Sequence, residues 1–172
     1  VTFSNGTTPR VNDSAEGIAP ESKELFDYAK RLGIQWESTE LADSGYRFFN
    51  DVNVELFVDY GKIGPGYIPG HAHSDTFSFV LNYKGNPFIV DPGISTYNIG
   101  YRRQRERSTS SHNTVRYGKV DQSEVWGGFR VGRRANAVIT DESKVAIKGY
   151  HNGYKRFGVY HQRIFNFNKK NI

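Results

Sequence analysis

Apolar and polar residues alternate with a period of two through much of the chain after residue 45, which is typical of β-strands with one buried face. Two stretches show the pattern most clearly, residues 54–60 (VELFVDY) and 76–83 (TFSFVLNY). Both are expected strands. Their expected core-facing residues are Val54, Leu56 and Val58 in the first and Phe77, Phe79, Leu81 and Tyr83 in the second.

A hairpin is expected after the second stretch. Lys84, Gly85 and Asn86 form a short turn into PFIVD, where Pro87 fits the first position of a strand or an edge strand. Further short strands are expected between Gly, Asp or Asn residues, over 113–117, 129–140, 144–150 and 157–167. Strands of this length and spacing indicate an all-β fold, an antiparallel β-sandwich.

The period changes near the N-terminus. Residues 20–33 (PESKELFDYAKRLG) have Pro at a first helical position, acids early, bases late and Gly at the end, which predicts a helix over about 20–32. Leu25, Ala29 and Leu32 would share one face. Asn12-Asp13-Ser14 is an expected turn. We therefore expect a connector with one helix over 1–44 and a sandwich domain over 45–172.

Composition narrows the possible functions. A chain of 172 residues has room for one ordinary domain. It contains no cysteine, which excludes disulfides and thiolate metal sites, and no segment is long or apolar enough to span a bilayer. The chain begins with Val and has no Met. We therefore expect it to be a piece of a longer protein.

Positive charge is concentrated in one stretch. The formal net charge is +5, and YRRQRER (101–107) carries four arginines within the long expected loop 92–111. Such a cluster attracts polyanions, either nucleic acid or an acidic polysaccharide. A solvated loop without a ligand is an equal alternative on charge alone.

The stretch PGHAHSD (69–75) holds two of the five histidines. If it is extended, His71, His73 and Asp75 point to the same side. Asp91 ends the strand that pairs back across the hairpin, and His112 precedes the next expected strand. Imidazole and carboxylate are suitable ligands for zinc or iron(II), and three protein ligands leave a position for water.

The spacing leaves two ligand sets open. His73, Asp75 and His112 would form the facial triad of an iron(II) and 2-oxoglutarate oxygenase, with Arg116 available for a co-substrate carboxylate. Alternatively, His73, Asp91 and His112 bind the ion while His71 faces a substrate.

Three stretches resemble a known family: GHAHSDTFSFVLNYKGNPFIVDPGISTY (70–97), RSTSSHNTV (107–115) and DQSEVWGGFR (121–130). In this order they are similar to the C-terminal β-sandwich domain of heparinase II/III-like polysaccharide lyases, which include related alginate lyases. The resemblance runs from about 45 to 165. Residues 12–34 resemble the connector that follows the helical toroid of these proteins.

The resemblance implies roles for residues of this chain. His73, Asp91 and His112 match the zinc ligands of the family, and His71 matches the histidine that faces the cleft and takes part in elimination. Tyr97 falls where some relatives contribute a tyrosine to the cleft. The main catalytic tyrosine and asparagine of the family lie in the N-terminal α/α toroid, which this chain lacks.

The implied reaction is β-elimination on a uronic-acid polymer. The C5 proton is removed beside the carboxylate and the C4 oxygen is expelled, so donors must stabilise the developing enediolate. Arg105 and Arg107 are candidate substrate contacts, since they lie in the basic stretch. The expected partners are an acidic polysaccharide and the missing toroid, with no nucleic acid and no membrane span. A periplasmic or secreted location follows from the resemblance, and a fragment without the toroid is expected to have little or no activity. A non-catalytic carbohydrate-binding domain remains an alternative.

Four other residues are expected to be structural. His151 lies in an expected turn and should be exposed, whereas His161 lies on an expected strand and should be a partly buried, hydrogen-bonded histidine. Trp126 and Phe129 offer rings for stacking on a sugar, but packing in the core under the preceding loop is the favoured expectation.

Overall fold

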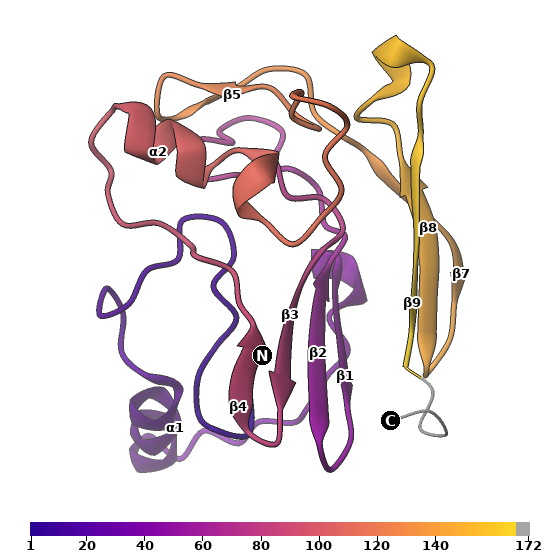
Figure 1. Cartoon of the computed structure of the whole chain (residues 1–172). Coiled ribbons are helices and arrows are strands. Elements are labelled where there is room, and N and C mark those ends of the chain that lie inside the picture. Colours follow the sequence, from indigo (N-terminus) through magenta and orange to yellow (C-terminus); the bar gives the residue numbers. More distant parts are fainter. Residues whose placement is uncertain (168–172) are drawn as a thin grey trace.

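The computed structural model describes residues 1–167, which form a sandwich of two antiparallel sheets (Figure 1). One sheet has the order β1-β2-β3-β4 and the other the order β7-β8-β9. The strands of the first are β1 (Tyr46–Asn50), β2 (Val54–Asp59), β3 (Ser78–Tyr83) and β4 (Asn86–Ile89); those of the second are β7 (Ala137–Glu142), β8 (Ala146–His151) and β9 (His161–Asn166). The expected all-β sandwich is confirmed.

The remaining elements lie mostly in the connections. The short strands β5 (Val125–Trp126) and β6 (Arg130–Val131) pair with each other near α2, above the sheets in Figure 1. The helices are α1 (Ser22–Arg31), α2 (Tyr101–Glu106) and the 3-10 turns η1 (Ala42–Ser44), η2 (Thr109–Ser111) and η3 (Lys155–Phe157). Within residues 1–167, every helix is too short or too polar to cross a bilayer.

The main core lies between the two sheets. Its buried members are Phe49, Val54, Val58, Tyr60, Phe77, Ile147, Phe165 and Phe167. Phe49 and Phe167 stack with ring centroids 5.8 Å apart, so that the first sheet and the end of the second are joined by aromatic contact.

The outer face of the first sheet is also covered. Phe3, from the N-terminal segment, packs with Phe57 and Val80, and both the backbone N–H and the hydroxyl of Ser4 donate to the Glu55 carboxylate, at 2.7 and 2.8 Å. The expectation that β2 and β3 bury only one face is therefore wrong. Because a second layer lies on this sheet, the polar residues Glu55, Asp59, Ser78 and Asn82 are buried as well, whereas Tyr83, expected to face the core, is 42% exposed.

The predicted hairpin is confirmed. β3 and β4 pair antiparallel, with Tyr83 opposite Asn86, and the two turn residues Lys84 and Gly85 have φ angles of 50° and 71°. A two-residue turn in which both residues have the left-handed backbone conformation matches the right-handed twist of the paired strands. The hairpin delivers Asp91 just beyond the end of β4.

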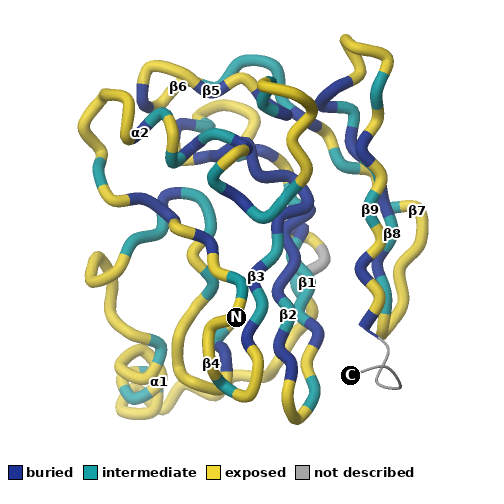
Figure 2. Tube along the Cα trace, viewed as in Figure 1, coloured by how far each residue is buried: buried dark blue, intermediate teal, exposed yellow. Residues whose placement is uncertain are grey.

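The predicted helix is confirmed as α1, which spans Ser22–Arg31 and begins with a capping box between Glu21 and Glu24. None of its residues is buried, and Leu25 and Leu32 are more than half exposed. Phe26 of the same helix stacks on Trp36, with ring centroids 5.2 Å apart, and most of α1 has the exposed colouring in Figure 2.

Two loop expectations are corrected. Residues 113–117 form no strand; the stretch contributes one isolated bridge, between Tyr117 and Val120. The expected loop 92–111 contains α2 and η2. Arg103 in α2 and Arg107 at its C-cap, four residues apart and on the same face, are both buried.

Candidate metal centre and the adjacent histidine

A buried cluster of His73, Asp75 and His112 lies where the segment before β3 meets the end of η2. Each offers one ligand atom, and these atoms lie within 4.8 Å of one another. The two imidazole rings have centroids 5.2 Å apart. The sequence prediction that His73 and His112 converge is in agreement with this geometry.

Among the described residues, one ring nitrogen of His112 makes a hydrogen bond and the other makes none. Its Nδ1 lies 2.7 Å from Oδ2 of Asp91, and since a carboxylate only accepts, Nδ1 carries the proton. The other oxygen of Asp91 accepts the backbone N–H of Gly93 at 3.1 Å. Nε2 of His112 is buried and has no hydrogen-bond partner among the described residues. Its lone pair is available to a ligand.

His73 shows the same arrangement with its nitrogens exchanged. Its Nε2 donates to Oδ1 of Asp13 at 2.9 Å, and its buried Nδ1 has no partner within residues 1–167. Metal-bound histidines normally donate their other N–H to an acceptor in this way. Nδ1 of His73 and Nε2 of His112, together with the Asp75 carboxylate, could therefore hold a metal ion, and imidazole and carboxylate are ligands that suit zinc.

Three buried carboxylates lie in or beside this cluster: Asp75 within it, and Asp59 and Asp91 next to it. Burial, and then the charge of Asp75, raise the pKa of Asp59 well above its usual range. For His112, burial lowers the pKa but the Asp91 bond and the charge of Asp75 prevail and raise it. Burial lowers the pKa of His73 against the opposing bond to Asp13. A divalent cation would offset this concentration of buried negative charge.

His71, in contrast to His73, faces outward, with a side chain 67% exposed. Its Nδ1 donates to Oδ2 of Asp13 at 2.6 Å, which leaves Nε2 as the nitrogen that a substrate can meet. The ring of Tyr97 lies edge-on at 6.0 Å between centroids, and that of Phe129 at 6.3 Å. The structure thus brings together the two residues predicted to face the cleft, His71 and Tyr97.

Asp13 and Arg103 complete the site and were not predicted. Arg103 is fully buried; its two terminal nitrogens both donate to the Asp13 carboxylate, Nη2 at 2.7 Å, and its Nε donates to the carbonyl of Gly128 at 3.0 Å. The guanidinium carbon lies 5.2 and 4.9 Å from the ring centroids of Tyr97 and Phe129. Burial would raise the pKa of Asp13, but the bonds from His73, Arg103 and His71 prevail and hold it well below its usual range.

The two arginines proposed as substrate contacts differ in exposure. Arg107 is fully buried and donates from Nε and Nη2 to the carbonyl of Ala72, at 3.2 and 2.9 Å. Burial and the nearby Arg103 lower its pKa to about 10. The expected substrate contact of Arg107 is corrected to a structural role, because the guanidinium supports the loop between His71 and His73. Arg105 is exposed, and its substrate contact stays a prediction.

The other histidines form a separate buried pair. His151 is fully buried at the end of β8, so the expectation that it is exposed is wrong; pairing of β8 with β9 places it opposite His161. Nδ1 of His161 lies 2.9 Å from Nε2 of His151, as expected for a hydrogen-bonded His161. Burial lowers the pKa values to about 3 for His151 and about 4 for His161, so both are neutral at pH 7.

Trp126 and Phe129 are 47% and 37% exposed, so the expectation of core packing is wrong for both. Phe129 stacks on Tyr97 beside His71, with ring planes 8° apart.

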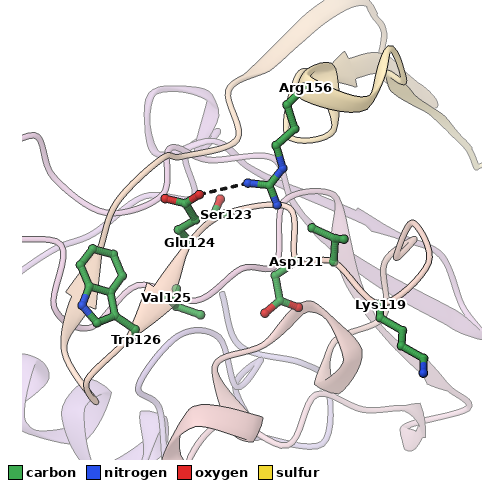
Figure 3. A pocket seen from close by; sticks show the side chains of 8 residues that line it. Lys119, Asp121, Ser123, Glu124, Val125, Trp126 and Arg156 are labelled. Carbon is green, nitrogen blue, oxygen red and sulfur yellow. Dashed lines mark hydrogen bonds and ion pairs between the residues drawn. The ribbon is translucent and has the colours of Figure 1, made fainter.

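Trp126 lines a separate open cleft of about 510 Å³ (Figure 3). Glu124 and Arg156 pair across this cleft at 3.0 Å. Arg116, considered above for an oxygenase, donates instead to the carbonyl of Lys119 at 2.6 Å.

Comparison with solved structures identifies the same fold in heparinase III. Two structures of a heparinase III gene product, the second with methylated lysines, align with TM-scores of 0.63 and 0.62 at 18% identity, over 95% and 96% of this chain. Another structure of heparinase III aligns with a TM-score of 0.58 at 16% identity, over 95% of this chain. This chain spans 28% of the first two and 29% of the third.

A comparison with curated protein sequences found no match. The model of the heparinase II/III-like C-terminal family, by contrast, matches residues 33–172, which is most of the chain and includes the cluster around His73 and His112. The chain therefore belongs to the heparinase II/III-like C-terminal family.

Proposed function

We propose that this chain is the sandwich domain of a lyase that cleaves uronic-acid-containing polysaccharides by β-elimination, and that it presents His71 to the cleft. The observation that carries the proposal is the position of His71. Its ring is exposed, held from one side by Asp13 and flanked by Tyr97, directly beside a buried cluster suited to a cation. Family membership supports the assignment to a polysaccharide lyase.

The exposed Nε2 of His71 suits two roles in such a reaction. As the neutral nitrogen it accepts a hydrogen bond or a proton, and when protonated it donates to the sugar carboxylate on which the charge of the enediolate develops. The ring of Tyr97 lies beside that of His71 and is 45% exposed, so its hydroxyl is a candidate proton donor to the C4 oxygen. The fixed bond to Asp13 keeps the imidazole oriented through these steps.

We further propose that His73 and His112 hold one zinc ion. Bound there, zinc would supply mainly structural cross-linking of the loop before β3 to the end of η2. The geometry favours Asp75 as the carboxylate ligand, with Asp91 as the acceptor for Nδ1 of His112. The family resemblance predicts Asp91 as the ligand, so the two assignments are alternatives.

Zinc content separates these alternatives. If Asp75 is the ligand, Asp75→Asn should purify without zinc, whereas Asp91→Asn should keep the ion with an affinity about 10- to 100-fold lower. The reverse order would assign Asp91. Equal, stoichiometric zinc in both variants would contradict a site built on either carboxylate.

Turnover is proposed for the longer protein only. The chain spans 28% of the first heparinase III structures, so the residues that complete the cleft would come from outside it. We propose that this remainder is an N-terminal α/α toroid and that the isolated chain has little or no activity. We also propose a periplasmic or secreted location, because polymeric substrates are met outside the cytoplasm.

One observation favours a second function. His73, Asp75 and His112 are also the set that an iron(II) oxygenase would use. Such an enzyme would purify with iron and consume 2-oxoglutarate, whereas the proposed lyase would purify with zinc and consume neither oxygen nor a co-substrate. Elemental analysis of the purified protein distinguishes the two.

The experiment for the main proposal uses the full-length protein on a panel of acidic polysaccharides. The formation of the conjugated double bond is followed by ultraviolet absorbance. His71→Ala should lower kcat by about 100-fold or more while zinc content stays stoichiometric. Asn98→Ala, at an exposed neighbour of Tyr97, is the matched control and should retain activity. A His71→Ala enzyme with wild-type turnover would contradict the proposed role, and so would a wild type that forms no unsaturated product on any substrate.

A further inference from the structure

Asp13 contacts both histidines of the site through different oxygens. Oδ1 accepts from Nε2 of His73 and Oδ2 accepts from Nδ1 of His71, at 2.9 and 2.6 Å. Each oxygen also accepts one bond from Arg103. The carboxylate therefore receives four bonds, which use all of its acceptor positions. No other side chain of the described residues is shown to bond both imidazoles.

The consequence is a pair of fixed tautomers. Because Asp13 accepts a hydrogen bond from the protonated Nε2 of His73, Nδ1 is unprotonated and its lone pair points into the buried cluster. Because Asp13 also accepts a hydrogen bond from the protonated Nδ1 of His71, the lone pair of Nε2 of His71 is left on the exposed side. The two rings, two residues apart in sequence, thus use opposite nitrogens for opposite tasks.

We propose that Asp13 is a positioning residue that sets the ring orientation and tautomer of His71 and His73 together and so couples the metal centre to the cleft-facing imidazole. This rests on the proposed function of those two histidines. Arg103 supports Asp13 in this role. It holds Asp13 with two parallel bonds, and its buried guanidinium is itself fixed by the carbonyl of Gly128 and by the rings of Tyr97 and Phe129.

Through Asp13, the N-terminal segment has a role in the site. Asp13 lies in a turn, and the carbonyl of the next residue, Ser14, accepts the backbone N–H of Ile94 at 2.9 Å. The side-chain oxygen of Asn12 accepts the backbone N–H of His73 at 3.2 Å. Three successive residues of this segment therefore bind the loops that carry the cluster, which holds the carboxylate at a fixed place between the two imidazoles.

The decisive substitution is Asp13→Asn, because the amide keeps the size of the side chain but has one nitrogen that cannot accept. The four bonds can then no longer all form, and any shift of the side chain that relieves the lost contact also moves the acceptor of the other histidine. In the full-length protein, zinc affinity is measured by competition with a chelating dye, and kcat and KM are measured on the preferred polysaccharide. We expect zinc affinity about 10- to 100-fold lower, kcat lower by a similar factor, and KM within about twofold. Asp43→Asn, the same change at an exposed carboxylate, should alter neither.

A double-mutant cycle distinguishes positioning from a general loss of structure. His71→Ala alone should leave zinc affinity unchanged. In the His71→Ala background, Asp13→Asn should still weaken zinc binding but should lower the residual kcat by less than about twofold when zinc is saturating. Arg103→Lys, which loses the two-pronged contact, should give a smaller loss of the same kind and serves as the second variant if Asp13→Asn does not fold.

The outcomes separate this inference from the function on which it rests. Zinc affinity and kcat both within twofold of wild type in Asp13→Asn would overturn it, and so would an equal fall in kcat with and without His71. A wild type that binds zinc but forms no unsaturated product would overturn the proposed lyase, while the zinc measurement would still decide whether Asp13 orients His73. A wild type that does neither would overturn both.

Discussion

Nδ1 of His71 lies 2.6 Å from Oδ2 of Asp13, although the two residues are 58 positions apart in the sequence. The N-terminal segment thereby becomes part of the site: it crosses the outer face of the first sheet, and its turn delivers the carboxylate. A residue from a segment expected to be only a connector thus holds the histidine expected to meet the substrate.

Gly93 allows this segment to approach. Its φ angle is 58°, and a Cβ at this position would lie 2.2 Å from the carbonyl oxygen of Ser14. Gly93→Ala should therefore displace the turn that carries Asp13 and lower the free energy of unfolding by more than about 1 kcal/mol. Urea unfolding measures this loss, and zinc affinity should fall in parallel. Gly17→Ala also has a positive φ but open space around it, and should leave zinc affinity unchanged. Wild-type zinc affinity in Gly93→Ala would show that the segment adapts.

The Tyr97 hydroxyl can be tested apart from its ring. Tyr97→Phe keeps the stacking on Phe129 and the contact with Arg103, so the free energy of unfolding should change by less than about 0.5 kcal/mol. If the hydroxyl donates a proton to the leaving oxygen, kcat of the full-length enzyme should fall about 100-fold or more with KM little changed. Steady-state kinetics measures both. A Tyr97→Phe enzyme with unchanged kcat would assign Tyr97 a packing role only.

Arg107 and Arg105 should respond in opposite ways to the same substitution. Arg107→Gln removes a buried guanidinium from the carbonyl of Ala72 and should cost about 2 to 4 kcal/mol of stability. Arg105→Gln, at an exposed position, should change stability by less than about 0.5 kcal/mol and should raise KM if Arg105 attracts the polyanion. Chemical unfolding and kinetics on the full-length enzyme test the pair. Equal stability of the two variants would contradict the structural role of Arg107.

The buried pair His151 and His161 predicts a pH dependence of stability. Burial holds their pKa values at about 3 and about 4, below the 6.5 of an exposed histidine, so below pH 6.5 the unfolded chain binds more protons than the folded one. Stability should therefore fall as the pH drops from 6.5 towards 4, by up to about 1.4 kcal/mol per pH unit for each histidine.

The measurement is urea unfolding at several pH values between 7 and 4.5. The double variant His151→Gln/His161→Gln should show a shallower slope than wild type over this range. Lys155→Gln, in the exposed turn η3, is the control and should keep the wild-type slope. If the free energy of unfolding of the double variant depends on pH as steeply as that of wild type, other groups cause the loss of stability at acid pH.

Periodicity and turn chemistry were enough to predict the sandwich, α1 and the β3–β4 hairpin, because each depends on residues close in sequence. The burial of both faces of β2 could not be predicted, since the layer over its second face comes from Phe3. Residues 113–117 alternate like a strand, but Thr114 bonds the carbonyl of Thr76 through its side chain and the backbone finds no partner strand.

The site was predictable where its residues have a local motif. His71 and His73 share one short stretch, and the predicted convergence of His73 with His112 agrees with the structure, although the strand expected after His112 does not form. Asp13 and Arg103 have no such signal: their bond joins positions 90 residues apart, and Arg103 could not be told from its exposed neighbours before the helical face of α2 was known. The choice between Asp75 and Asp91 depends on the orientation of the His112 ring, which spacing does not fix.

Anomalous diffraction at the zinc edge, from crystals of the zinc-loaded protein, shows whether one zinc ion lies between His73 and His112. We expect a single strong peak within bonding distance of Nδ1 of His73, Nε2 of His112 and one aspartate oxygen, with His71 bonded to Asp13 and free of the ion. No peak between these two imidazoles in zinc-loaded crystals, or a peak bound to His71 instead, would contradict it.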